Sequence, residues 1–270
     1  MEKRVSVTIS DGVADVRLVR ADKMNALDAA MFDALVATSE RLAQEKGVRA
    51  VVLSGEGRSF CAGLDMGRFV AMKDKGGNGV AGGEARDLTT RTHGLANFPQ
   101  QAVWGWRQLP VPVIAAIQGV AFGGGFQLAL GADMRLLSPD ARMSIMEIKW
   151  GLVPDMAGTP ILASLVRDDI LRELTYTGRI FSAQEALSYG LATRICDDPR
   201  ATAFEVAREI AGKSPDAIRA AKRLLNNLSV VPGPALLAES VEQMKLMGTA
   251  NQQEAVRANL EKRAPRFADA

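Results

Sequence analysis

Two glycine-containing turns have the composition of backbone anion sites. One is the segment 59–65 (SFCAGLD), which follows the apolar run 48–54, and the other is 119–125 (GVAFGGG), which follows the apolar run 112–118. Glycine lets a backbone approach a ligand closely, and the second turn opens a predicted helix, whose first N–H groups lack partners. Turns that face each other would form an oxyanion hole, whereas ordinary strand-to-helix connections are the commoner alternative.

Two carboxylates follow these turns. Glu147 stands between Met146 and Ile148, and this apolar setting is expected to raise its pKa toward that of a useful general base. Asp155 lies eight residues further along the chain. It either shares in proton transfer or caps a helix predicted to begin near Thr159.

Composition excludes several other kinds of chemistry. The chain of 270 residues has 33 Lys and Arg against 31 Asp and Glu, so neither nucleic acid nor an acidic membrane is an expected partner. The cysteines Cys61 and Cys196 and the single histidine, His93, provide no metal-ligand spacing and no disulfide framework. Since no signal-peptide pattern or membrane-length apolar run occurs, we expect a cytoplasmic protein without a metal.

The apolar patterns predict the elements that position these residues. A hairpin is expected around Asp11-Gly12, followed by a helix over 28–46. Buried strands are predicted at 48–54, 112–118 and 132–138, with a helix from the triple glycine to Gly131. This alternation of strands and helices indicates an α/β fold with a largely parallel, covered sheet.

The segment 73–110 interrupts this alternation, and the rest of the chain is helical in pattern. A loose glycine-rich loop precedes Phe98, Trp104 and Trp106, whose aromatic rings belong either to the core or to a pocket wall. Ser182 and Glu185 form a capping box. Further helices are predicted over 201–213, 215–227, 235–247 and 251–262.

Four motifs in order along nearly the whole chain resemble the crotonase family, also called the enoyl-CoA hydratase/isomerase superfamily. They are 20–27 (RADKMNAL), 59–65 (SFCAGLD), 117–125 (IQGVAFGGG) and 146–155 (MEIKWGLVPD). The resemblance implies repeated ββα units that form two roughly perpendicular sheets, a core domain over 1–198 and a C-terminal helical trimerisation region over 199–270. A homotrimer or a dimer of trimers is the implied assembly.

The resemblance also implies how the turns act. In this family the backbone N–H groups at the positions of Leu64 and Gly124 hold a thioester oxygen. Removing a proton next to the thioester, or adding water to an enoyl thioester, creates an enolate whose charge these donors stabilise. Each such donor is worth roughly 2.7–4 kcal/mol in the transition state.

The implied acid and base residues depart from the hydratase pattern. Hydratases of the family use two glutamates, and here those positions hold Gln127 and Glu147. An amide does not transfer protons at ordinary pH, so Gln127 either contacts substrate or makes a buried hydrogen bond. Glu147 with Asp155 is similar to the pair in dienoyl-CoA isomerases. Isomerisation is therefore favoured, with hydration by Glu147 alone, or a non-catalytic acyl-CoA binder, as the alternatives.

Coenzyme A would arrive as part of the substrate, with no permanently bound cofactor. The resemblance places it against Lys23, Met24, Leu27, Ala62, Leu64 and Asp65. Lys23 either attracts a phosphate or is simply exposed. Lys222 and Arg223 in the tail either reach a ligand of a neighbouring subunit or form a solvated helix face.

Overall fold

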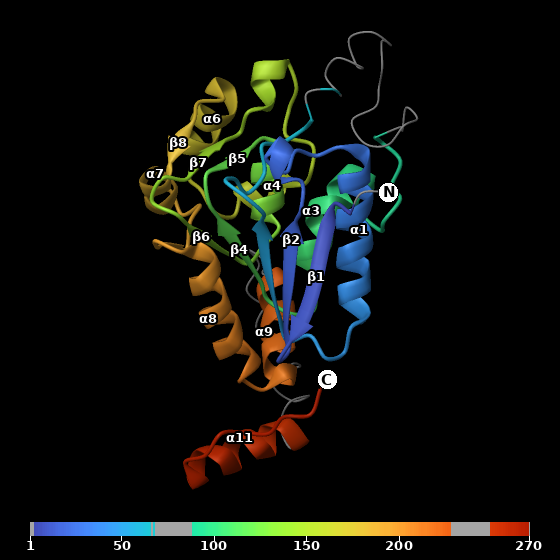
Figure 1. Ribbon diagram of the computed structural model, residues 1–270, viewed down its shortest axis with the longest axis vertical. Coiled ribbons are helices and arrows are strands. Elements are labelled where there is room, and N and C mark those ends of the chain that lie inside the picture. The colour runs from blue at the N-terminus through green and yellow to red at the C-terminus, as the bar shows by residue number, and fades with distance from the viewer. Residues whose placement is uncertain (1–2, 66, 68–87, 228–248, 270) are drawn as a thin grey trace.

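The computed structural model describes residues 3–65, 67, 88–227 and 249–269, and the account below concerns these. Its larger sheet has six strands in the order β1-β2-β3-β4-β6-β9 (Figure 1). The strands are β1 (Val5–Ser10), β2 (Val13–Leu18), β3 (Ala50–Gly55), β4 (Val113–Ile117), β6 (Met134–Leu137) and β9 (Arg194–Ile195). Only the β1–β2 pair is antiparallel among them, and it forms the predicted hairpin.

A smaller sheet has the strand order β5-β7-β8. It contains β5 (Val120–Phe122), β7 (Arg142–Ser144) and β8 (Phe181–Ser182). Strand β5 is parallel to β7, and β7 is antiparallel to β8. Since β5 leads directly into the triple glycine and β7 leads toward Glu147, this sheet positions both the second turn and the segment that contains Glu147.

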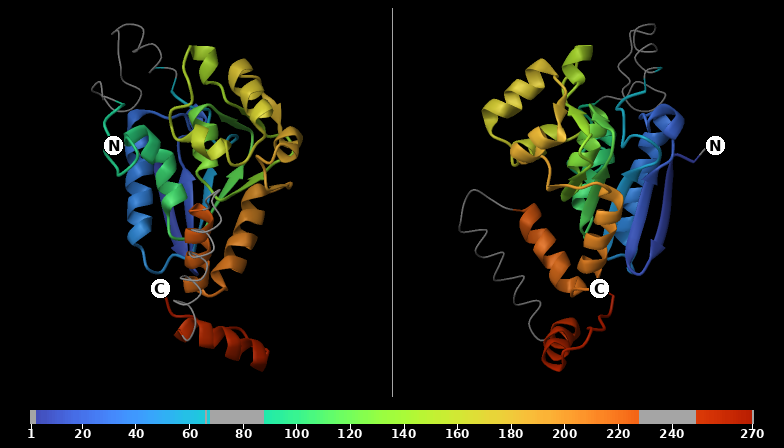
Figure 2. Two further views of the ribbon diagram at one scale, coloured as in Figure 1. Left: turned by 180° about the vertical axis from the view of Figure 1, so that it is seen from behind. Right: turned by 60° about the vertical axis from the view of Figure 1, so that its left-hand side comes forward.

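Helices cover both faces of the larger sheet at its centre, which explains why β3 and β4 are buried along their whole length. Val51 and Leu53 face the cluster formed with α1 (Ala29–Gln44), α3 (Phe98–Gln108) and α4 (Gly124–Leu130). Ala50 and Val52 point to the other face, where α8 (Pro199–Ala211) packs. Successive side chains of a strand alternate between faces, so a sheet covered twice needs apolar residues at every position. Figure 2 shows these helices on the two sides of the sheet.

Local capping signals agree with the observed helix starts. Asp28 caps α1 by accepting a hydrogen bond from the Met31 N–H. Asn97 and Gln100 form a capping box at α3, and the predicted box of Ser182 with Glu185 is present at α7 (Ala183–Ser188). Such caps satisfy N–H groups that have no partner within the helix.

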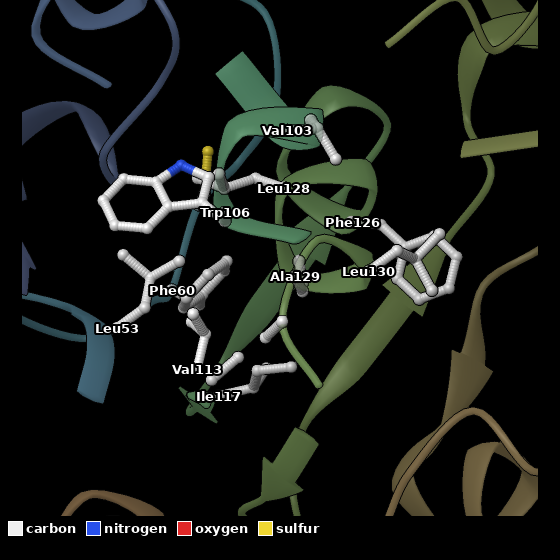
Figure 3. Packing of buried hydrophobic residues seen from close by; sticks show 14 of the residues in the cluster. Leu53, Phe60, Val103, Trp106, Val113, Ile117, Phe126, Leu128, Ala129 and Leu130 are labelled. Carbon is white, nitrogen blue, oxygen red and sulfur yellow. The ribbon is translucent and has the colours of Figure 1, made fainter. Parts of the chain in front are cut away.

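The aromatic residues of α3 belong to the core. Trp106 is fully buried, and Figure 3 shows its ring near Phe60 and Leu53. Phe98 and Trp104 pack against the same core from partly buried positions. None of the three lines the cavity described below, so the pocket-wall alternative is wrong for them. The glycine-rich start of the 73–110 segment lies outside the described residues.

The remaining elements lead from the smaller sheet into the tail. They are the 3-10 turns η1 (Ala21–Lys23) and η2 (Glu147–Trp150) and the helices α5 (Gly158–Leu162), α6 (Asp168–Thr177), α9 (Pro215–Asn226) and α11 (Ala250–Glu261). The helix predicted at 235–247 lies outside the described residues. In the described parts of the chain, no helix combines the length and apolar character needed to cross a membrane.

Lys222 has neither of the two roles expected for it from the sequence. It is 5% exposed, and its Nζ donates to the Val111 carbonyl and to Asp133 Oδ2, both at 2.8 Å. The lysine therefore ties α9 to the end of the larger sheet within one chain. Removing an ammonium group from water requires such compensation, which a helix pattern alone does not reveal.

Candidate active site

A single cavity of about 960 Å³ contains the residues that the sequence singles out. It lies where the turns after β3 and β4 meet the segment from η2 to α5. Ligand cavities of α/β folds commonly lie beyond the carboxyl ends of the parallel strands. The ten candidates among the lining residues are Lys23, Met24, Leu27, Ala62, Leu64, Asp65, Gly124, Gln127, Glu147 and Asp155.

The first turn runs beside the segment that follows η1. The Leu27 N–H donates to the Gly63 carbonyl at 2.8 Å, and the Asp65 N–H donates to the Leu27 carbonyl at 3.1 Å. These two bonds make Leu27 and Leu64 a short parallel bridge. In such a bridge the N–H of the intervening residue points to the opposite edge of the strand, so the Leu64 N–H faces away from Leu27.

The second turn lies directly against the first. Cys61 pairs with the second turn because its N–H donates to Val120 O at 3.0 Å and its carbonyl accepts from Phe122 N at 3.1 Å. Gly63 has a φ of +89°, and a Cβ there would lie 2.5 Å from the Phe122 carbonyl oxygen and 3.7 Å from Gly124 N. Only glycine fits this contact, which explains why the turn contains one.

Two N–H groups remain available at this junction. Within the described parts of the chain, neither the Leu64 N–H nor the Gly124 N–H donates a hydrogen bond, and both residues line the cavity. Gly124 is the first residue of α4, where N–H groups lack intrahelical partners. Both residues whose N–H group has no partner among the described residues therefore line the same cavity.

The hydrogen-bond partners of Gln127 on α4 determine which end of its amide is the oxygen and which is the nitrogen. Its Oε1 accepts from the Met156 N–H at 2.9 Å and from the Gly158 N–H at 3.1 Å. Two backbone donors can only meet the carbonyl end of the amide, so Nε2 faces Glu147 and donates to its Oε1 at 2.6 Å. Gln127 therefore makes buried hydrogen bonds and also lines the cavity.

Glu147 begins η2, and its carboxylate is only half satisfied. Oε2 is buried and accepts no hydrogen bond within the described chain, while Oε1 is held by Gln127. Burial is the main cause that raises the pKa of Glu147, and the negative charge of Asp155 raises it further. A carboxylate with one unsatisfied oxygen and a raised pKa suits a general base.

Asp155 lines the same cavity and does not cap a helix. Helix α5 begins after Ala157, which has a φ of +65° and makes no side-chain cap, so the capping alternative is wrong. Burial raises the pKa of Asp155 as well. Two carboxylates with raised pKa values in one cavity provide two places for a proton.

The rest of the cavity is largely apolar, and most of this wall was not identified from the sequence. Trp150, Leu152 and Val153 are exposed side chains that line it. The contributions of Leu88 and Ile180 come from distant segments, and only their tertiary placement reveals them. Exposed large apolar side chains around a cavity are typical of sites for apolar ligands.

Charged groups border the same cavity. Lys23, Asp22 and Lys149 line it together with Asp65. The Asp65 carboxylate is already engaged, because it binds Arg20 and accepts from the Gly67 N–H at 2.8 Å. In the described residues no group of three or more His, Cys, Asp or Glu side chains is arranged to hold a metal ion.

The sequence and the fold match a known enzyme family. The family model for enoyl-CoA hydratase/isomerase matches residues 8–270. Carnitinyl-CoA dehydratase from Proteus mirabilis is 34% identical over 247 residues, covering 89% of this chain and 88% of that protein. The mitochondrial Delta(3,5)-Delta(2,4)-dienoyl-CoA isomerase of Mus musculus is 32% identical over 214 residues, covering 78% of this chain and 64% of that protein.

A solved structure agrees with these similarities. The crystal structure of an enoyl-CoA hydratase from Bacillus anthracis has a TM-score of 0.87 and 30% identity, and the match covers 98% of this chain and 99% of that one. The α/β architecture is therefore the crotonase fold. The chain belongs to the enoyl-CoA hydratase/isomerase family and is an enzyme of that family.

Proposed function

We propose that this enzyme moves a double bond within the acyl chain of an enoyl- or dienoyl-CoA thioester. The thioester oxygen accepts hydrogen bonds from the Leu64 and Gly124 N–H groups. Glu147 takes a proton from the acyl chain, and the electron pair of that C–H bond spreads into an enolate held by the two donors. Returning a proton to a different carbon restores the neutral thioester, so no water is added and no leaving group is needed.

The observation that carries this proposal is the arrangement of Glu147, Asp155 and Gln127. Both carboxylates line the cavity, and burial raises both of their pKa values. The Gln127 carbonyl is occupied by two backbone N–H groups, and an amide does not ionise in any case. A second proton carrier at the Gln127 position is therefore absent, and Asp155 takes that role for a distant carbon.

Water addition or elimination by Glu147 is the second candidate. The similarity to carnitinyl-CoA dehydratase supports it, because that relative is named for the removal of water. Glu147 Oε2 is buried and accepts no hydrogen bond from a described residue, so this oxygen has hydrogen-bonding capacity that a water molecule would satisfy once a small shift of the surrounding side chains exposes it.

The remaining parts of the proposal concern ligand and assembly. Coenzyme A contacts Lys23, Met24, Leu27, Ala62 and the backbone of the first turn. The roughly perpendicular arrangement of the two sheets, the division at 198/199, the homotrimer and the cytoplasmic location stay predictions from the resemblance. No permanently bound cofactor takes part in the steps above.

An isotope experiment separates the candidates. The protein is incubated in deuterated water with short and medium 2-enoyl-, 3-enoyl- and 3,5-dienoyl-CoA, and the products are followed by mass spectrometry. Deuterium-labelled positional isomers without a gain of water support isomerisation. Addition of water supports the second candidate. Tight binding of all three thioesters with neither reaction would show a non-catalytic acyl-CoA binder and refute the proposal.

A further inference from the structure

Arg20 connects the two segments that form the Leu27–Leu64 bridge. It stands just beyond β2, and its side chain is 15% exposed. Its Nη1 pairs with Asp65 Oδ2 and also donates to the Ala26 carbonyl at 3.0 Å. Ala26 precedes Leu27 and Asp65 follows Leu64, so one guanidinium group holds both partners of the bridge.

Asn25 holds the same two segments at the other end of the turn. Its Oδ1 accepts from the Arg20 N–H at 2.9 Å, and its Nδ2 donates to the Ser59 carbonyl at 2.9 Å. Asn25 is fully buried. The first turn is thus tied to the 20–27 segment before Leu64 by Asn25 and after Leu64 by Arg20, which leaves the Leu64 peptide little freedom.

The Asp65 carboxylate acts within the chain through both of its oxygens. Oδ2 receives Arg20, and Oδ1 accepts from the Gly67 N–H at 2.8 Å. Burial would raise the pKa of Asp65, but the hydrogen bond from Arg20 and the other cationic contacts lower it overall, so the group stays charged. An ionised carboxylate bonded to a guanidinium is a strong and directional contact.

We propose that Arg20, acting through Asp65, is a positioning residue that aims the Leu64 N–H at the enolate oxygen. The inference rests on the proposed function, because it assigns a task to the oxyanion donor of that reaction. Arg20 itself touches no reacting atom. Preorganised donors stabilise developing charge only when their direction is fixed before the reaction, and small displacements of a reacting group cost about 10²-fold in rate.

Arg4 offers a matched control for this proposal. Its side chain is also 15% exposed, and it pairs with Asp28 at 2.8 Å. Arg20 contacts the same aspartate at 3.6 Å. Arg4→Met therefore removes a cation of similar exposure from the same ionic cluster, while the contacts of Arg20 with Asp65 and Ala26 remain.

Binding of two ligands tests the proposal without turnover. A saturated acyl-CoA reports binding of a neutral thioester, and a 3-oxoacyl-CoA reports binding of an enolate, whose ultraviolet absorbance gives the ionised fraction at each pH. Arg20→Met is expected to weaken enolate binding about 10- to 100-fold, a large part of what losing an oxyanion donor costs. Binding of the saturated thioester should change less than about threefold, since a neutral carbonyl gains much less from such donors. Arg4→Met should leave both affinities close to those of the wild type.

Two conservative variants keep the test decisive if Arg20→Met does not fold. Asp65→Asn retains the shape of the side chain without its charge, and it should weaken enolate binding in the same selective way. Arg20→Lys restores a positive charge one atom short of Nη1, so its enolate affinity should be higher than that of Arg20→Met and of Asp65→Asn. Thermal melting of each variant confirms that the folded protein is measured.

The outcomes separate this proposal from the proposed function. A wild-type protein that does not favour the enolate over the saturated thioester overturns the oxyanion site and the positioning role together. The wild type and the variants are compared by how much more tightly they bind the enolate than the saturated thioester. If this preference is the same in the wild type, Asp65→Asn and the folded Arg20 variants, the oxyanion site is supported and the positioning role of Arg20 is wrong. Equal losses for both ligands would show that Arg20 merely supports the fold, and would also overturn the proposal.

Discussion

Gln127 donates a hydrogen bond from Nε2 to Glu147 Oε1 across 2.6 Å. The orientation of the amide is determined by the Met156 and Gly158 N–H groups on its carbonyl side. Glu147 is consequently an acceptor on this side, and its buried Oε2 accepts no hydrogen bond from a described residue. The position that carries the second glutamate in the hydratase pattern thus holds an amide that contacts Glu147 on one side and the segment after Asp155 on the other.

Glu147→Gln should abolish proton transfer. The variant keeps a hydrogen-bonding side chain but removes the base, and general base catalysis is worth about 10²–10⁴ in rate. Deuterium incorporation at the carbon next to the thioester is the measurement. Glu205→Gln on the exposed side of α8 is the surface control. It should catalyse deuterium exchange into the substrate at the wild-type rate. A fully active Glu147→Gln protein would contradict the assignment of the base.

The rate of this exchange should depend on pH through Glu147. The base must be ionised, and burial together with the charge of Asp155 raises its pKa above the ordinary 4.5. The rate of deuterium exchange should therefore rise with pH, and the midpoint of this rise should lie above the ordinary pKa of a glutamate. In Asp155→Asn the neighbouring charge is absent, so the midpoint of the pH–rate profile should move to lower pH while exchange persists. A midpoint that does not move would show that the charge of Asp155 has no effect on the pKa of Glu147.

Asp155→Asn should also separate exchange from isomerisation. The asparagine cannot deliver a proton to a distant carbon, so isomerisation of the dienoyl thioester should fall by about 10²-fold or more, as expected for a lost general acid or base. Product formation and deuterium exchange are followed in the same reaction. Equal losses of both activities would indicate that Asp155 is needed for Glu147 to act and is not a second proton carrier.

Gln127→Glu should change the reaction as well as the pH profile. Two carboxylates would face each other across the present 2.6 Å contact, so one proton would be shared and the apparent pKa of the pair should rise. Above that pKa the second carboxylate can activate water, and hydration of a 2-enoyl-CoA should increase about tenfold or more. Gln44→Glu at the exposed end of α1 adds the same charge away from the cavity. This control should hydrate a 2-enoyl-CoA no faster than the wild type does.

Gly158→Ala should disturb the same network sterically. A Cβ at this position would lie 2.7 Å from Gln127 Oε1 and 2.9 Å from its Cγ. Relieving such overlap in a packed site costs about 1–3 kcal/mol of unfolding free energy, and it would move Gln127 away from Glu147. Denaturant unfolding and exchange kinetics measure the two effects. Gly47→Ala has nothing within 4 Å of the new Cβ and should leave the activity unchanged.

Lys222→Met should destabilise the chain without changing the chemistry. Among the described residues the substitution leaves Asp133 with the hydrogen bond from the Val113 N–H at 2.7 Å, and losing one partner of this partly buried ion pair should cost about 1–3 kcal/mol. Lys213→Met, whose lysine is 59% exposed, should cost less than about 1 kcal/mol. If the two substitutions shift the unfolding midpoint equally, Lys222 does not anchor α9.

Patterns local to the sequence determined much of the fold, and the resemblance of its motifs to a known family supplied most of the candidate residues. Alternating apolar residues and Asp11-Gly12 specify the β1–β2 hairpin, and Asp28 and Ser182 mark helix starts with their own side chains. The two glycine turns follow buried strands because the chain must bend where each strand ends. These features depend on neighbours within a few residues, which is why the order of amino acids suffices to find them.

Tertiary structure alone decided how the candidate residues are connected. Asp155 lies in the cavity and does not cap α5, and the Gln127 amide has one orientation because α4 packs beside the Asp155 segment. Lys222 is buried because α9 meets Asp133, 89 positions away, and Arg20 meets Asp65 across 45 positions. The partner of a polar side chain depends on which distant segments the sheets bring together. Spacing along the chain carries no such information, so burial, pairing and pKa follow only from the folded arrangement.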